Sequence, residues 1–138
     1  MSTETADIVN HPPHYTMHAS GVECIEITEY MSFNIGNAFK HVWRSGLKKN
    51  TVEDLKKAAW YITREIDRKR GMILQGIVVE TYTPDVLNDR MREVLKHEVG
   101  SRGAILTALF LYHQNASSYR QLSAAALHLD DLINTAGE

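Results

Sequence analysis

The chain has 138 residues, of which 43% are hydrophobic, and a formal net charge of −2 at pH 7, as expected for one compact globular domain. The single cysteine, Cys24, excludes an intrachain disulfide framework and fits a reducing compartment. A sequence pI near 6.4 argues against a helical nucleic-acid-binding protein, because such proteins usually carry a basic overall balance.

No positively charged, apolar leader opens the sequence, so we expect no secretion signal. The longest apolar run, residues 104–112, is too short to span a bilayer and is typical of a buried helix. We therefore expect a single domain over residues 1–138 with no membrane partner and no double-stranded nucleic acid partner.

Residues 10–15 read Asn-His-Pro-Pro-His-Tyr. Two adjacent prolines forbid a regular helix or a central strand, so this stretch predicts a constrained loop that presents His11, His14 and Tyr15. His18 and Cys24 follow, but the spacing of these histidines and the cysteine matches no standard zinc pattern. Histidines held by hydrogen bonds are therefore favoured over a metal site.

Residues 23–31 predict a short helix with Glu23, Glu26 and Glu29 at three-residue intervals. A Glu-x-x-Glu pair can hold magnesium in all-α nucleotide pyrophosphohydrolases. Those enzymes need a second acidic pair on a later helix, and the available Glu65 and Asp67 would face different sides. A pyrophosphohydrolase is therefore kept only as a third alternative.

A cationic element lies at the centre of the sequence. Residues 34–70 hold ten of the fifteen Lys and Arg residues against four acids, a local charge of +6 in a chain whose total is −2. An anionic ligand responds to such local charge rather than to the total. The periodicity of this stretch predicts two helices joined by a short basic turn.

The first of these helices, residues 34–45, separates apolar from polar positions. Its apolar face consists of Ile35, Ala38, Phe39, Val42 and Trp43, and its polar face of Asn34, Asn37, Lys40, His41 and Arg44. Lys40 and Arg44 are neighbours on that face and repel each other, so an anion between them would remove the conflict. The alternative is a basic face that only water covers.

The second helix begins near Thr51, where Asp54 three residues later completes a capping-box pattern. Its apolar stripe consists of Leu55, Ala58, Ala59, Ile62 and Ile66. Beside that stripe, Asp54, Lys57 and Tyr61 form a line at helical spacing. We expect this line and the Asn37/Lys40/Arg44 face to border one cleft.

The rest of the chain predicts further helices. Residues 76–82 form a β-branched run, either a lone strand or an extended connector. Pro84 is expected at the first position of the next helix, residues 100–103 break that helix, and a core helix follows over residues 102–114. A capping box of Ser118 and Gln121 starts the last helix.

The predicted architecture is all-α, with five or six helices, a central basic hairpin and an N-terminal Pro/His loop. It divides into a hairpin module, residues 10–74, and a C-terminal helical extension, residues 84–138. The helices have more apolar surface than a small bundle needs, so we expect a homo-oligomer.

Four sequence blocks carry a resemblance to a known family: residues 10–15 (NHPPHY), 23–25 (ECI), 37–46 (NAFKHVWRSG) and 54–62 (DLKKAAWYI). In this order they resemble a small bacteriophage family of mostly uncharacterised proteins that includes a podophage nucleotide kinase without a P-loop. The resemblance covers residues 10–70, and the chain after residue 75 has no counterpart in it. It implies conversion of deoxynucleoside monophosphates to diphosphates in the cytoplasm of the infected bacterial host.

The sequence agrees with this in containing no Gly-x-x-x-x-Gly-Lys-Ser/Thr motif, so phosphates would have to be bound by side chains. We assign catalysis to Lys40 and Arg44 as phosphate-binding cations, and to His11 or His14 as a proton carrier or a further hydrogen-bond donor to phosphate. Asp54 is expected either to hold Lys57 or Arg44 in place or to bind a metal together with the phosphates. ATP or another nucleoside triphosphate is the expected phosphate donor, and the need for magnesium is open.

A second set of residues is expected to bind the nucleotide. Tyr15 can stack on a base or donate its hydroxyl, Asn37 can orient a phosphate or base, and Lys57 adds charge next to Tyr61. No residue is assigned to a metal. The alternative hypothesis is a non-catalytic phage protein that uses the same cations to bind a nucleotide or a host protein, in counter-defence or regulation.

Overall fold

The computed structural model describes residues 18–47, 51–116 and 119–136, and throughout these residues the only regular secondary structure is helical. The elements are α2 (Ile25–Thr28), α3 (Phe33–Ser45), α4 (Thr51–Leu74), α5 (Asp85–Leu95), α6 (Gly100–Gln114) and α7 (Arg120–Ala136). The predicted all-α class is therefore confirmed. No helix in the described part of the chain is both long and apolar enough to cross a membrane.

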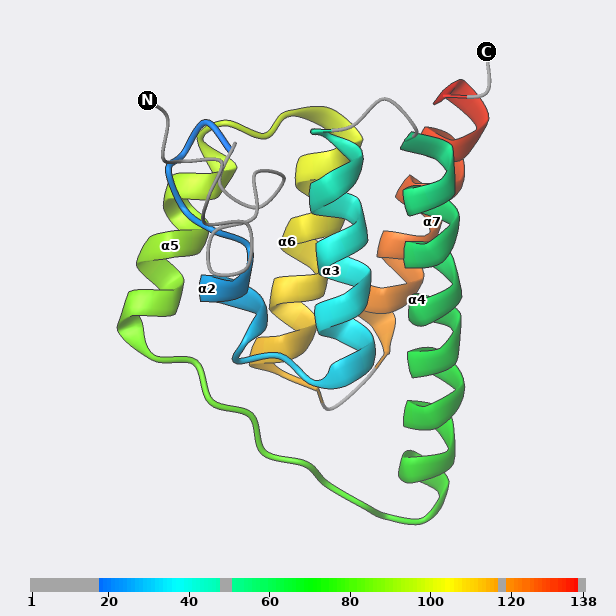
Figure 1. Ribbon diagram of the computed structural model, residues 1–138. Helices are drawn as coiled ribbons and strands as arrows, with labels where there is room; N and C mark the ends of the chain where they lie inside the picture. The colour runs from blue at the N-terminus through cyan, green and yellow to red at the C-terminus, as the bar shows by residue number, and fades with distance from the viewer. Residues whose placement is uncertain (1–17, 48–50, 117–118, 137–138) are drawn as a thin grey trace, which may run out of the picture.

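Two antiparallel helix pairs form the body of the protein (Figure 1). Helix α3 packs along α4, α6 packs along α7, and contacts of α4 with α7 and of α3 with α6 join the pairs. One cluster of buried apolar side chains draws on all six described helices. The short α2 and the helix α5 cover one side of α3 and α6.

The apolar faces predicted for the central hairpin are the faces that the structure buries. Ile35, Ala38, Phe39, Val42 and Trp43 of α3 are at most 1% exposed. Leu55, Ala58 and Ile62 of α4 are equally buried, and Ala59 and Ile66 pack at the edge of the same core. Burial of these side chains supplies the main stabilisation of the hairpin, because apolar area removed from water is worth about 25 cal/mol per Å².

Several element boundaries differ from the predicted ones. Helix α2 spans only Ile25–Thr28, within the predicted 23–31. Pro84 is the N-cap of α5 rather than its first residue, with an extended ψ of 158°. The predicted break at residues 100–103 is wrong in part: Gly100 begins α6 with a φ of +67°, and Gly103 lies inside that helix.

Another part of the backbone approaches Gly103 closely, which explains why a glycine lies inside this helix. A Cβ atom at this position would lie 3.1 Å from the carbonyl oxygen of Glu98. A glycine there lets the start of α6 pack against the turn that precedes it.

Residues 75–84 connect α4 to α5: a turn at residues 75–76 leads into residues 77–84, which run on without forming a helix or a strand. In Figure 1 this connector runs from the lower end of α4 across the bottom of the helices to α5. Of the two predicted forms of the β-branched run, the extended connector is therefore the one found. Ser118, predicted to cap the last helix, lies outside the described residues.

Candidate functional site

A buried histidine–aspartate pair lies between the two helices of the hairpin. Nδ1 of His41 on α3 lies 2.9 Å from Oδ1 of Asp54 in the first turn of α4, and both residues are more than 90% buried. The ring of His41 also stacks on that of Tyr61, at 5.9 Å between centroids and 14° between planes. The pair therefore ties a polar side chain of each helix to the other at the edge of the core.

Burial keeps His41 in its neutral form. Desolvation is the largest influence on its pKa and lowers it below 6.5, and the nearby charges of Lys40 and Arg44 act in the same direction against the raising effect of Asp54. With a proton on Nδ1 donated to Asp54, the Nε2 atom of neutral His41 is an acceptor. Nε2 has no hydrogen-bond partner in the described part of the chain.

Lys40 and Arg44 flank His41 along α3 and are both half-buried. Neither forms an ion pair with any described residue, and the buried Nε of Arg44 has no hydrogen-bond partner among them. The charges of Lys40 and Arg44 also favour the thiolate form of Cys24 at the start of α2. Burial outweighs them and raises the pKa of that thiol to about 12. Two cations that no described acid neutralises thus lie beside the neutral imidazole.

Three further predicted residues border this region in different ways. The Asn37 side-chain amide donates a hydrogen bond of 2.8 Å to the carbonyl oxygen of Phe33, one turn earlier on α3. Tyr61 is half-buried, and its ring stacks on one face of the His41 imidazole. Lys57 points into solvent, with 53% of its side chain exposed, and pairs with Glu53 at 3.0 Å. We therefore define the hairpin site as Asn37, Lys40, His41, Arg44, Asp54 and Tyr61.

The predicted loop residues His11, His14 and Tyr15 lie outside the described residues. His18, which the structure does describe, has a packing role. Its ring lies 4.4 Å from that of Trp43, and its nitrogens contact Ser20 and Glu98 at 2.7 Å and 3.0 Å.

Two of the acids considered for magnesium, Glu26 and Glu65, are already engaged by other groups. Glu26 pairs with Arg90 at 3.7 Å and accepts the backbone N–H of Glu23. Glu65 is 1% exposed, whereas Asp67 on the same helix is 66% exposed at its side chain. Over residues 18–47, 51–116 and 119–136, no group of three His, Cys, Asp or Glu side chains is placed to hold a metal ion.

Glu65 is instead the centre of a second polar cluster that joins three helices. Its carboxylate accepts hydrogen bonds from Asn34 of α3 at 3.1 Å, from Arg68 of α4 at 2.8 and 2.9 Å, and from Tyr112 of α6 at 2.7 Å. Burial alone would raise the pKa of Glu65, but these donors outweigh it and lower the pKa. The cluster therefore holds the helices in register around an ionised carboxylate.

Sequence reasoning placed His41 on the polar face of α3 and gave it no role. Its burial depends on α4, whose Asp54 and Tyr61 cover it from positions 13 and 20 residues further along the chain. The available signal was a histidine within one turn of both Lys40 and Arg44, with an acid at the start of the next helix.

The profile of a protein family of unknown function, DUF3310, matches residues 9–63 of this chain. The match covers residues 9–17, α2, α3 and the first half of α4, and every residue of the hairpin site lies within it. This uncharacterised family agrees with the expected resemblance to a small family of uncharacterised proteins. No curated protein and no solved structure matches the chain.

Proposed function

We propose that the hairpin site binds the phosphates of a nucleotide and that the protein is a nucleotide kinase without a P-loop. It would transfer the γ-phosphate of ATP or another nucleoside triphosphate to a deoxynucleoside monophosphate, in the cytoplasm of a phage-infected bacterium. The supporting observation is the pair of cations, Lys40 and Arg44, that have no acid partner among the described residues and flank a neutral His41. An anion is the group that such a pair is suited to bind.

The chemistry of phosphoryl transfer requires mainly positioning and charge neutralisation. The Arg44 guanidinium would bind two phosphate oxygens in a fork, and the Lys40 ammonium would act as a point charge. A phosphate monoester has its second pKa near 6, so part of the acceptor carries one proton at neutral pH. Nε2 of His41 would accept that proton while the phosphate oxygen forms the new bond to the γ-phosphorus and the diphosphate leaving group departs.

The test is a direct assay of phosphate transfer. The purified chain is incubated with ATP and each of the four deoxynucleoside monophosphates, with and without MgCl2. The deoxynucleoside diphosphate formed is measured by anion-exchange chromatography. The proposal predicts diphosphate formation that Arg44→Ala lowers by about 100-fold or more, the effect typical of removing a charge contact to a transferring group. Lys56→Ala, an exposed cation on α4, is the control and should retain activity.

Absence of diphosphate in every reaction would rule out the kinase. If nucleotides then raise the melting temperature of the wild type but not of Arg44→Ala, the site is a nucleotide-binding site without transfer. If neither binding nor transfer is found, a role in binding a host protein replaces the nucleotide hypothesis.

A further inference from the structure

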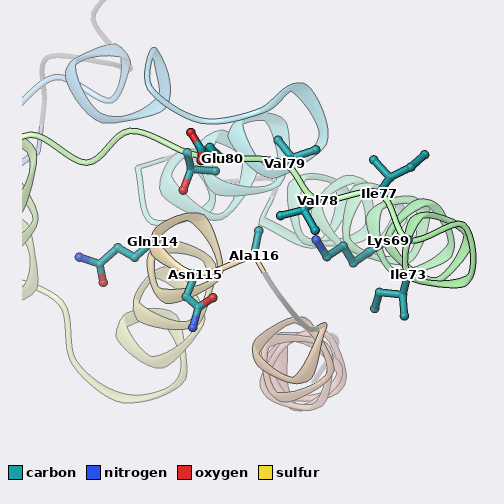
Figure 2. Close-up of a pocket in the computed structure, with 11 residues that line it drawn as sticks. Lys69, Ile73, Ile77, Val78, Val79, Glu80, Gln114, Asn115 and Ala116 are labelled. Carbon is teal, nitrogen blue, oxygen red and sulfur yellow. The ribbon is translucent and has the colours of Figure 1, made fainter.

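A cleft of about 470 Å³ opens between the C-terminal half of α4, the connector and the end of α6 (Figure 2). Ile73, Ile77, Val78, Val79 and Ala116 give it mostly apolar walls. Its volume lies within the range of small-molecule and peptide-terminus sites. The cleft shares no residue with the hairpin site, and the proposed kinase activity does not use it.

Lys69 is the one cation among the residues that line the cleft. It is only 4% exposed, yet it makes no ion pair or hydrogen bond with any described residue. Glu65, the acid one turn earlier on the helix, already accepts bonds from three other side chains. Figure 2 shows the Lys69 side chain extending from α4 toward Val78 and Val79. The Lys69 side chain therefore has no counter-charge among the described residues, and an anion entering the cleft would supply one.

The connector side of the cleft offers unpaired backbone groups. At one end of the connector, the Ile77 amide donates a hydrogen bond of 2.9 Å to the carbonyl oxygen of Met72. Nearer its other end, Nε2 of His113 contacts the carbonyl oxygen of Tyr82 at 2.9 Å. Between these points, residues 78–81 make no hydrogen bond with any described residue, although their conformation is extended. Such a segment can accept another strand.

The charge around the cleft limits how much negative charge a ligand can carry. Glu80 also lines the cleft, and α6 ends there at Gln114 with its carbonyl groups, the negative end of the helix dipole. A single ammonium in these surroundings suits a carboxylate better than a doubly charged phosphate.

We propose that this cleft binds the C-terminal end of an extended peptide from a partner protein. The terminal carboxylate would pair with Lys69, the last apolar side chain would lie among Ile73, Ile77 and Ala116, and the peptide backbone would add a strand to residues 78–81. This arrangement uses the three unsatisfied features of the region together: the unpaired ammonium, the apolar walls and the free backbone groups.

The test uses a fluorescein-labelled hexapeptide of alternating threonine and valine that ends in valine, made both as the free acid and as the C-terminal amide. Fluorescence anisotropy should show that the acid binds at least about tenfold more tightly than the amide, as for a charge-assisted hydrogen bond. Lys69→Met keeps the apolar stem, and should lower affinity for the acid to that for the amide. Lys56→Met, on the exposed face of the same helix, should leave both affinities unchanged.

Equal binding of acid and amide by the wild type would overturn the proposal even if Lys69→Met failed to fold. Binding of decanoate with no binding of the peptide acid would overturn it in favour of a small amphiphilic carboxylate. A dimer in sedimentation that Val79→Asp abolishes, with no peptide binding, would assign the connector to a second copy of this chain.

Discussion

The imidazole of His41 and the carboxylate of Asp54 meet at 2.9 Å across the α3–α4 interface, and the two residues are more than 90% buried. The contact requires a rotation of α4 that turns Asp54, in its first turn, toward α3. It also fixes which imidazole nitrogen is left available beside Lys40 and Arg44. The same contact thus serves the packing of the hairpin and the proposed chemistry.

Stability should depend on pH through His41. Its folded pKa lies below the unfolded value of about 6.5, so the unfolded chain binds more protons between the two values. The free energy of unfolding should therefore fall as pH is lowered through about 6.5, and His41→Gln should flatten this dependence. Urea unfolding at pH 5.5 and 8.0 measures it, with His128→Gln on the exposed face of α7 as the control. An unchanged slope in His41→Gln would show that another group titrates.

Glu65→Gln should destabilise the fold by about 1–3 kcal/mol, because it weakens bonds from Arg68, Tyr112 and Asn34 to a buried carboxylate. The partial exposure of Arg68, at 45% of its side chain, keeps the expected loss below that of a fully buried ion pair. Asp67→Asn, two residues away and exposed, should change stability by less than about 0.5 kcal/mol. Equal losses in the two variants, measured by urea unfolding, would contradict a structural role for the Glu65 cluster.

Nucleotide binding should respond unequally to the lysines predicted for the site. Lys40→Ala removes a half-buried cation without a described acid partner, whereas Lys57→Ala removes an exposed one already paired with Glu53. We expect Lys40→Ala to weaken ATP binding about tenfold or more and Lys57→Ala to change it about twofold or less. Isothermal titration calorimetry distinguishes them, and the reverse order would move the phosphate site onto the exposed face of α4.

Two helical glycines should respond oppositely to the same substitution. Gly71→Ala places a methyl group in open space on α4 and should stabilise the fold by about 0.5–1 kcal/mol through helix propensity. Gly103→Ala brings its methyl group 3.1 Å from the Glu98 carbonyl oxygen and should lose that gain or reverse it. Melting temperatures of the two variants test this prediction. Equal stabilisation would mean that the Glu98 backbone moves aside at no cost in free energy.

The all-α class and the inward faces of the central hairpin can be predicted from the residue pattern. Helical periodicity is a local property, so the spacing of Ile35, Phe39 and Val42, and of Leu55 and Ile62, identified buried positions without knowledge of the partner helix. The concentration of cations between residues 34 and 70 was likewise visible in the chain and singled out Lys40 and Arg44.

Which polar groups meet depends instead on how the helices pack against one another. The rotation of α4 against α3 brings Asp54 to His41 and leaves Lys57 in solvent, although both belong to one predicted line along α4. The connector that returns past α4 encloses Lys69, which periodicity had not distinguished from its cationic neighbours. Sequence spacing sets the face of a helix on which a side chain lies, but the register and rotation between helices depend on how whole apolar surfaces interlock.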